Sequence, residues 1–283
     1  MKLILSCTVV LIVIFAGVSS QAQVTLTLYD NFQSKYLNPD NWFGSESGTT
    51  VLESVRQIKT DPVYGYKSLS LLHRGYGGTG SNSGRTVARN RLLFSDGTGI
   101  STIQAKVQVK KVQAVGCTAN ITNPNTDVQA RFGGFFFNTG TPTPGDSTND
   151  VGAFVALRRL SESDDKPNVL EVVGYAIHCT NADCTQSTPI GDTGQDLGTA
   201  LVGQRIKLRI TWDQVNNRFV FQKGNSSEVP LAYDPGTYPD GADPGTSNGG
   251  FKRLDVQELV TNCTSLPRPV GFMEVWFDDV FTN

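Results

Sequence analysis

The sequence predicts an all-β protein built as a sandwich of two antiparallel sheets. From Arg205 to Trp212 apolar and polar residues alternate, and the alternation resumes from Arg218 to Lys223 after the turn-forming segment Asp213–Asn217. A period of two places one face of a strand in a core and the other in solvent. Because Asp and Asn favour turns, this stretch predicts a β-hairpin. Other strand-like runs follow one another with almost no helical spacing between them, which excludes crossover helices and favours antiparallel sheets.

The other expected elements follow in chain order. In the longest run, residues 100–115, Ile103, Ala105, Val107 and Val109 share one face, and the intervening positions are mostly polar. This pattern indicates a strand with one solvated face. The runs that we expect to form strands are Val24–Leu28, Lys67–His73, Arg85–Phe94, Ile100–Val115, Val128–Asn138, Val151–Leu160, Val169–Cys179, Arg205–Trp212, Arg218–Lys223, Leu254–Thr261 and Val270–Phe281. Three polar stretches rich in Gly, Pro, Thr or Asp are expected to be loops: Thr139–Asp150, Thr180–Gly203 and Asp234–Gly250.

The first 22 residues have the pattern of a secretory signal peptide. Lys2 precedes an apolar run from Leu3 to Val18, and the small-residue exit Ser19–Ala22 follows. These are the three regions of such a signal, with cleavage expected after Ala22. The alternative, an uncleaved anchor, is disfavoured because a membrane span needs about 20 apolar residues. We therefore expect a secreted or extracellular protein, periplasmic or at the cell surface if bacterial, with one domain over residues 23–283 and no integral membrane segment after signal removal.

Charge excludes some partners, and the cysteines indicate an oxidising compartment. The net charge is −2 and the pI is near 5.7, which disfavours binding to nucleic acid. Four cysteines remain beyond the signal, and four cysteines allow three disulfide pairings. Cys179 and Cys184 bracket a turn-like tetrapeptide. We pair them with each other, which leaves Cys117 with Cys263.

Two short segments near the ends of the chain resemble those of a known superfamily. Tyr29–Phe32 is followed by Leu37–Trp42, which together resemble the opening of secreted concanavalin A-like lectin/glucanase domains. Val275–Val280, with the sequence VWFDDV, resembles their last strand, and the hairpin around Asp213–Asn217 is also typical of them. The resemblance implies a jelly roll in which the first and last strands pair and one concave sheet faces the ligand. Lectins, binding modules, glucanases and polysaccharide lyases share this fold, so the fold does not choose among them.

The resemblance also implies a structural Ca²⁺ ion. Many members of the superfamily bind calcium through an aspartate of the last strand and groups near the first strand. Asp278 matches that aspartate by position, and Asp30 is the nearest carboxylate in the opening segment. Calcium takes six to eight oxygen ligands, so backbone carbonyls and water would have to complete the shell. The alternative is that Asp278 belongs to a solvated strand end.

The catalytic motifs of the related enzymes are not found in the sequence. Retaining glucanases of this fold carry closely spaced carboxylates on one strand, and the nearest pattern here is Glu274 and Asp278 with Trp276 between them. Of the lyase motifs, Ala176–His178 keeps only the Ile and His residues, and the tyrosine segment has no counterpart. We interpret His178 as a structural residue. Whether the protein is an enzyme is left open, with the motifs arguing against it.

Four residues of the expected central strands are candidates for binding a glycan. Arg131 shares a face with Phe135 on one strand, and Glu171 shares a face with Tyr175 on another. Aromatic rings and charged groups suit sugar pockets if these strands form the concave sheet. The alternative for the phenylalanines is burial in the core, which is worth roughly 1.5–3 kcal/mol each. The sequence thus predicts a secreted glycan-binding domain. A divergent polysaccharide hydrolase or lyase is one alternative, and a self-associating structural or adhesive component is another.

Overall fold

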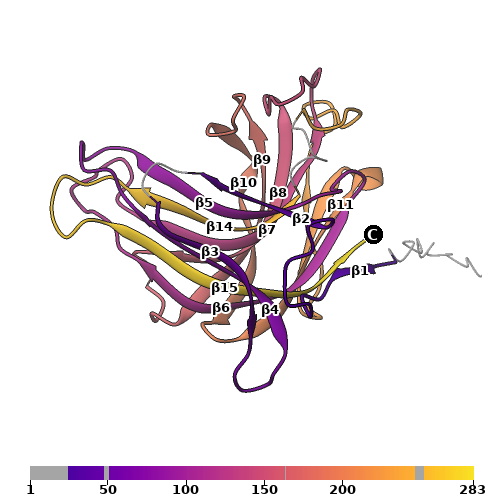
Figure 1. Ribbon diagram of the computed structural model, residues 1–283. Helices are drawn as coiled ribbons and strands as arrows, with labels where there is room; N and C mark the ends of the chain where they lie inside the picture. The colour runs from indigo at the N-terminus through magenta and orange to yellow at the C-terminus, as the bar shows by residue number, and fades with distance from the viewer. Residues whose placement is uncertain (1–24, 48–50, 163, 246–251) are drawn as a thin grey trace, which may run out of the picture.

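The computed structural model describes residues 25–47, 51–162, 164–245 and 252–283. The predicted signal peptide lies outside the described residues. Fifteen strands are present in the described chain, and neighbouring strands are antiparallel throughout (Figure 1). In the part of the chain that is described, no helix is long and apolar enough to cross a membrane. The predicted fold class, a two-sheet antiparallel sandwich, is confirmed.

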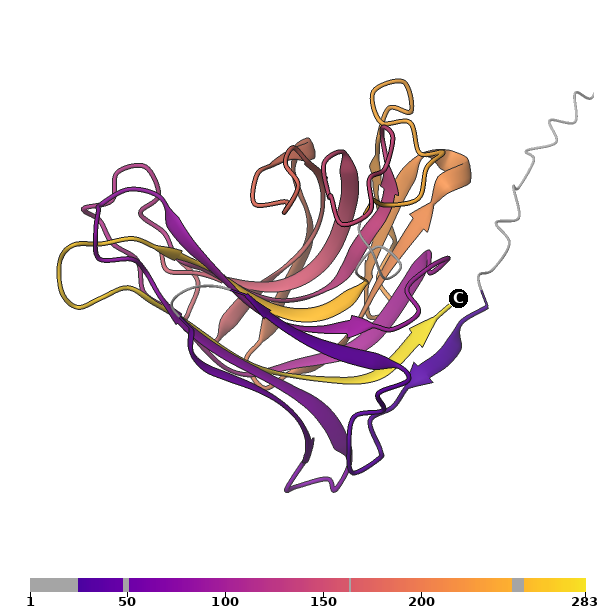
Figure 2. The ribbon, with the colours of Figure 1, turned by 45° about the horizontal axis from the view of Figure 1, so that its top comes forward.

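One sheet has eight strands and the other has seven. The path of the eight-stranded sheet is β13 (Val229–Ala232), β12 (Arg218–Lys223), β11 (Arg205–Asp213), β6 (Thr102–Ala114), β15 (Val270–Thr282), β4 (Lys67–Tyr76) and β3 (Val51–Thr60), with β1 (Thr27–Asp30) pairing with β15. The path of the seven-stranded sheet is β10 (Ser187–Leu201), β9 (Val169–Cys179), β8 (Asp150–Leu160), β7 (Asp127–Asn138), β14 (Arg253–Thr261), β5 (Arg85–Phe94) and β2 (Trp42–Ser47). Figure 2 shows both sheets bowed in the same direction, so the outer face of the seven-stranded sheet is concave.

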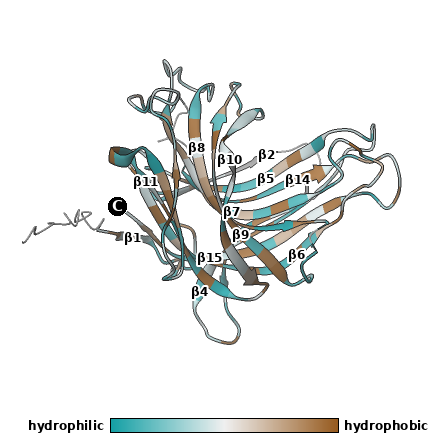
Figure 3. Ribbon diagram, turned by 180° about the vertical axis from the view of Figure 1, so that it is seen from behind, coloured by the Kyte–Doolittle hydropathy of each residue, from teal (hydrophilic) through white to brown (hydrophobic). Residues whose placement is uncertain are grey.

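The core lies between the sheets, where the alternation predicted it. Ile103, Ala105 and Val107 of β6 are buried there, and so are Ile206 and Leu208 of β11. In Figure 3 the strands carry alternating hydrophobic and hydrophilic bands, which is the same period of two seen on the ribbon. Because each sheet buries one face against the other, the outer faces remain available for polar side chains.

The predicted hairpin is present. β11 and β12 pair in register from Leu208 opposite Lys223 to Asp213 opposite Arg218. The connection is a short 3₁₀ turn, Gln214–Asn216, in which the Asp213 carboxylate accepts a hydrogen bond from the Asn216 backbone N–H. Asn217 then adopts φ 50°, the left-handed conformation that asparagine tolerates well.

The first and last strands pair as the resemblance implied. Of the four side chains of the last strand that we expect in the core, Met273, Val275, Phe277 and Phe281, one lies elsewhere. Met273, Val275 and Phe277 point into the core, but Phe281 is only half-buried and Val280 takes its place. The register of β15 against β6 shifts between Asp278 and Phe281, and Asp279 has φ 45°. A bulge adds one residue to a strand and thereby reverses the alternation beyond it.

The prediction of a loop over Thr180–Gly203 is wrong, because the strand β10 occupies most of this segment. This strand pairs with β9 at the edge of the seven-stranded sheet and contains two register shifts. Each register shift interrupts the period of two, so no regular alternation marks this strand in the sequence. β2, β3 and β13, none of which was predicted, lie at or near sheet edges too.

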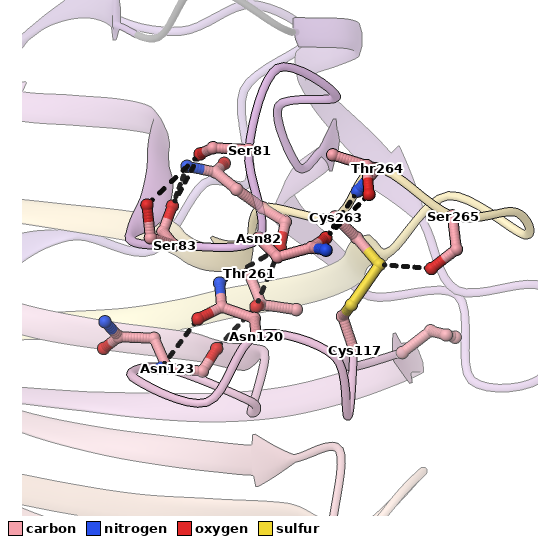
Figure 4. Close-up of a disulfide and its surroundings, with 12 residues drawn as sticks. Ser81, Asn82, Ser83, Cys117, Asn120, Asn123, Thr261, Cys263, Thr264 and Ser265 are labelled. Carbon is pink, nitrogen blue, oxygen red and sulfur yellow. Dashed lines mark hydrogen bonds between the residues drawn. A yellow bond between two sulfur atoms is a disulfide. The ribbon is translucent and has the colours of Figure 1, made fainter.

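Both predicted disulfides are present in the structure. Cys117, after β6, is bonded to Cys263, after β14, so this bond links the two sheets (Figure 4). Beside it, the carboxamide oxygen of Asn82 accepts hydrogen bonds from the backbone N–H and the hydroxyl of Thr264. The closed loop spans 146 residues, and the chain-entropy model assigns such a loop about 4–5 kcal/mol of stabilisation. Cys179 is bonded to Cys184 at the end of β9.

Candidate functional site

The outer face of the seven-stranded sheet carries an unusual number of charged side chains. We call it the concave face and define it by the outward positions of its five central strands. Those strands are β5, β14, β7, β8 and β9, and they lie side by side in that order. The outward residues that the argument uses are Arg89, Arg91, Asp127, Gln129, Arg131, Phe135, Phe154, Arg158, Glu171, Tyr175, Arg253, Asp255 and Gln257.

At the centre of the concave face, Arg131 of β7 is bonded to Asp255 of β14. Its Nε and Nη2 atoms each lie 2.9 Å from a carboxylate oxygen, and both residues are buried. Burial opposes ionisation of Asp255, but the Arg131 and Arg253 guanidinium groups outweigh it and hold the pKa of Asp255 below its usual range. The bidentate geometry is the strongest form of this ion pair. The pair therefore stays charged at neutral pH.

Tyr175 of β9 extends this pair into a network that crosses three strands. Arg131 Nη1 donates to the Tyr175 hydroxyl oxygen at 2.7 Å, and that hydroxyl donates to Gln129 Oε1 at 2.9 Å. Burial raises the pKa of Tyr175, although Arg131 opposes the shift. The phenol is therefore neutral at physiological pH and acts here as a hydrogen-bonding group.

Arg253 lies beside the same carboxylate. Its Nε donates to Asp255 Oδ2 at 3.2 Å, so one carboxylate serves two buried guanidinium groups. The Phe154 ring lies against both cations, with its centroid 4.4 Å from Arg131 Cζ and 4.8 Å from Arg253 Cζ. Burial is the main cause that lowers the pKa of Arg253, to about 9, and neighbouring arginines add to it.

A row of polar side chains crosses the sheet next to this cluster. In register across four strands lie Arg158, Gln129, Gln257 and Arg89. Arg89 Nε donates to Gln257 Oε1 at 3.1 Å, and burial lowers the pKa of Arg89 to about 10. At the other end, Arg158 Nε donates to Glu171 Oε2 at 2.8 Å, and both side chains are about one-third exposed. The row therefore has a guanidinium group at each end and amides between them, and Glu171 extends it by pairing with Arg158.

The four candidate residues from the sequence all lie on the concave face, but they have different environments. Arg131 and Tyr175 are bonded to each other, and Glu171 is paired with Arg158. Phe135 is 5% exposed and packs against the Cys179–Cys184 disulfide, apart from the core between the sheets. That these residues bind a glycan stays a prediction.

Sequence reasoning missed Arg89, Arg253 and Asp255. The signal was present in the alternation, since Arg253, Asp255 and Gln257 are polar while Leu254 and Val256 are apolar and buried. In β5 the signal was weaker, because the residue between Arg89 and Arg91 is the buried polar Asn90. What the sequence did not provide was the strand order, which places β14 between β7 and β5.

The carboxylates of the concave face are engaged with neighbouring groups. Asp255 binds two arginines, Glu171 binds Arg158, and Asp127 Oδ2 accepts a hydrogen bond from Gln129 Nε2 at 2.9 Å. Burial raises the pKa of Asp127. This arrangement can bind and orient polar groups, and it contains mostly hydrogen-bond donors.

His178 and Glu274, the residues closest to enzyme motifs in the sequence, lie away from this network. His178 Nε2 is 3.0 Å from the Thr139 hydroxyl, and burial lowers its pKa. Glu274 is on β15 in the other sheet, where it pairs with Lys59 Nζ at 2.9 Å.

The two carboxylates expected to hold calcium each have other partners. Asp30 accepts hydrogen bonds from the Phe32 backbone N–H and from Trp42 Nε1, both at 2.7 Å. Asp278 is paired with Arg205 and accepts a hydrogen bond from the Asp279 backbone N–H at 2.8 Å. Burial is the main cause that raises the pKa of Asp278. N–H and guanidinium donors do not make an oxygen-rich calcium shell, and calcium binding between the ends stays a prediction.

A second concavity lies outside the concave face. It has a volume of about 220 Å³ and is lined by the loop 97–101, by Phe136 and Trp212, and by Lys252. The Lys252 side chain donates to the Phe135 carbonyl oxygen, and its ammonium group lies 4.4 Å from the Phe136 ring centroid. Burial lowers the pKa of Lys252 to about 7, although Asp150 and Asp243 oppose the shift.

Several solved structures resemble this one in the arrangement of strands. A β-1,3-glucanase from Mycobacterium marinum is 12% identical, with 92% of this chain and 99% of that chain covered and a TM-score of 0.38. A family 7 alginate lyase is 11% identical, with 86% and 93% covered and a TM-score of 0.37. The lectin I-B4 from Griffonia simplicifolia is 12% identical, with 90% and 99% covered and a TM-score of 0.27.

These matches are glucanases, a lyase and a lectin, which are the kinds of protein included in the concanavalin A-like lectin/glucanase superfamily that the sequence resembles. At these identities and scores the likeness says nothing about activity. No protein-family model matches the sequence. No curated protein matches it either.

Proposed function

We propose that this protein is a secreted glycan-binding domain and that the concave face is its binding surface. One observation carries the proposal: a bowed sheet whose inner face forms the core presents a connected network of hydrogen-bonding side chains on its outer face. Arg131, Tyr175 and Gln129 form the centre of that network. A solvated face without a ligand has no need of buried polar groups, because each one costs free energy unless it is bonded.

The chemistry of the concave face suits sugars. Sugar hydroxyls both donate and accept hydrogen bonds, and the face offers guanidinium, carboxamide and phenol groups in register on neighbouring strands. The Tyr175 ring is partly exposed and packs against the buried Phe154 ring, with 5.6 Å between the centroids, so it adds apolar surface for the CH groups of a sugar. The two disulfides and the expected signal peptide support action outside the cell.

The test is binding of the full chain to an array of immobilised polysaccharides, followed by titration calorimetry on those retained. Tyr175→Phe removes one hydroxyl from the network, so we expect roughly 2- to 10-fold weaker binding, in line with the net worth of one hydrogen bond. The matched control is Tyr64→Phe. Tyr64 is 76% exposed in the turn between β3 and β4, so its substitution should leave binding unchanged.

Three other results would redirect the proposal. Release of reducing ends or unsaturated products from the same polysaccharides would identify a hydrolase or a lyase. Self-association of the purified chain with no glycan retained would favour a structural or adhesive component. Equal binding by Tyr175→Phe and the unsubstituted chain would move the site away from the concave face.

A further inference from the structure

The concave face has more cationic than anionic groups. Its guanidinium groups belong to six arginines, Arg85, Arg89, Arg91, Arg131, Arg158 and Arg253, and the carboxylates among them are those of Asp127, Glu171 and Asp255. The protein as a whole has a net charge of −2, so this excess is local and opposes the overall charge. A cleft lined by one sign of charge attracts ligands of the opposite sign.

The excess charge is greatest where the face is most buried. Arg131 and Arg253 are 3% and 4% exposed, and both are bonded to the single carboxylate of Asp255. Burying a charge without its own partner is costly. Arg131 has the bidentate bond to Asp255, so the charge of Arg253 is the less well compensated of the two. Burial lowers the pKa of Arg253, and its neighbours Arg131 and Arg89 lower it further. A bound anionic group would offset this cost, whereas a neutral sugar would not.

The rim of the face supplies little compensation. Asp183 lies on the loop closed by the Cys179–Cys184 disulfide, and its pKa is lowered mainly by hydrogen bonds from Thr185, with a smaller contribution from Arg89. Its carboxylate accepts the Thr185 hydroxyl at 2.8 Å and is exposed, so it is screened by water. The charge of the buried arginines therefore remains largely uncompensated by Asp183.

The spacing of the row Arg158, Gln129, Gln257 and Arg89 indicates an extended ligand. These residues occupy four adjacent strands in register, so three strand separations lie between the two cations. With about 4.8 Å between strands, the row is about 14 Å long at the backbone. A single small anion cannot contact both ends, whereas a chain of several sugar units can do so.

We propose that the ligand of the concave face is an anionic polysaccharide, one carrying carboxylate or sulfate groups, which runs across the strands and pairs with Arg89 and Arg158 at the two ends of the row. This inference rests on the proposed glycan-binding function and names its class of ligand. The amides of Gln129 and Gln257 between the cations, with the Tyr175 ring beside them, favour a glycan over other polyanions.

The experiment compares a polyuronate with the same polymer after chemical reduction of its carboxyl groups to alcohols. Calorimetry of the full chain in 50 mM NaCl should show at least 10-fold tighter binding of the polyuronate, and 300 mM NaCl should remove most of that difference because salt screens charge. A sulfated polysaccharide of similar length, as a second arm, distinguishes sulfate from carboxylate as the preferred group.

Two variants test the residues. Arg89→Gln and Arg158→Gln each remove a cation from one end of the row and should weaken polyuronate binding 5- to 10-fold, with little change for the reduced polymer. The matched control is Arg209→Gln on β11 in the other sheet, where the arginine pairs with Glu228, and it should have no effect. Thermal melting of each variant establishes that it is folded. If one of the two row variants does not fold, the other still tests the inference.

The outcomes separate this inference from the function on which it rests. Equal binding of the polyuronate and its reduced form would overturn the anionic ligand and leave glycan binding intact. Binding of neither polymer, nor of any polysaccharide on the array, would overturn both. Equal binding of a single-stranded DNA oligomer would show a general attraction for polyanions and would also overturn the inference.

Discussion

Replacing Asp255 with asparagine tests the central ion pair of the concave face. The substitution keeps the shape of the side chain and removes its charge, so it creates no cavity. It leaves the guanidinium groups of Arg131 and Arg253 buried with no carboxylate between them. Removing one partner of a buried pair typically costs roughly 3–5 kcal/mol, because the remaining charge is left uncompensated. For a chain of this size that corresponds to a fall in melting temperature of roughly 10 °C.

The assay is urea denaturation followed by tryptophan fluorescence, with Asp40→Asn as the control for an exposed aspartate. The double variant Asp255→Asn with Arg131→Met removes both partners of the bidentate pair, so its loss of stability should be smaller than the sum of the losses of the two single variants. A loss below 1 kcal/mol for Asp255→Asn, or additive effects in the double-variant cycle, would refute the description of this network as a tightly coupled buried pair.

The same pair predicts a dependence on pH. The pKa of Asp255 is lower in the folded protein than in the unfolded chain, where it is about 3.9. The folded state therefore binds fewer protons, and the stability from this carboxylate is fully present above about pH 4 and is lost as pH falls through the folded pKa. The difference in stability between the unsubstituted chain and Asp255→Asn should accordingly shrink below pH 4.

Further predictions concern the rest of the molecule. Lys252 has a folded pKa of about 7, below its unfolded value of about 10.4, so stability should rise between pH 7 and pH 10 by up to about 1.4 kcal/mol per pH unit from this group; Lys252→Met should abolish that slope, and an unchanged slope would contradict the assignment. Phe277→Ala should cost roughly 3–5 kcal/mol in urea denaturation, and a loss under 1 kcal/mol would mean that the register of β15 is wrong. If calcium binds between the chain ends, a chelator should lower the melting temperature of the unsubstituted chain but not of Asp278→Asn, and no response in the former would exclude the ion. Peptide mapping without reductant should recover a peptide linking Cys117 to Cys263, and free thiols would contradict this pairing.

Sequence reasoning was most successful where side chains alternate over a long strand. The period of two in β6 and β11 identified Ile103 and Ile206 as core residues because each of these strands buries one face. It failed at β10, where two register shifts interrupt the alternation, and at Phe281, because the bulge at Asp279 reverses the facing of the residues beyond it. In both cases the alternation is interrupted by a change of register against the neighbouring strand.

Only part of the candidate site could be predicted from the sequence. Arg131 and Tyr175 were each assigned to a face of a strand, and the structure places both on the concave face. Asp255, which binds Arg131, lies 124 residues away in the sequence. No local pattern relates two such positions, since their contact depends on β14 pairing with β7.

The sequence by itself determined the fold class, the hairpin and the face that most strands bury, because alternation and turn chemistry act between neighbours in the chain. It also indicated which cysteines pair. Cys179 and Cys184 bracket a turn-like tetrapeptide, and Cys117 and Cys263 are the two that remain. Only the tertiary structure decided that arginines and carboxylates from five strands share one concave face. Strand order sets that balance of charge, and strand order arises from the packing of whole sheets around a common core, where contacts between residues far apart in the chain outweigh local preference.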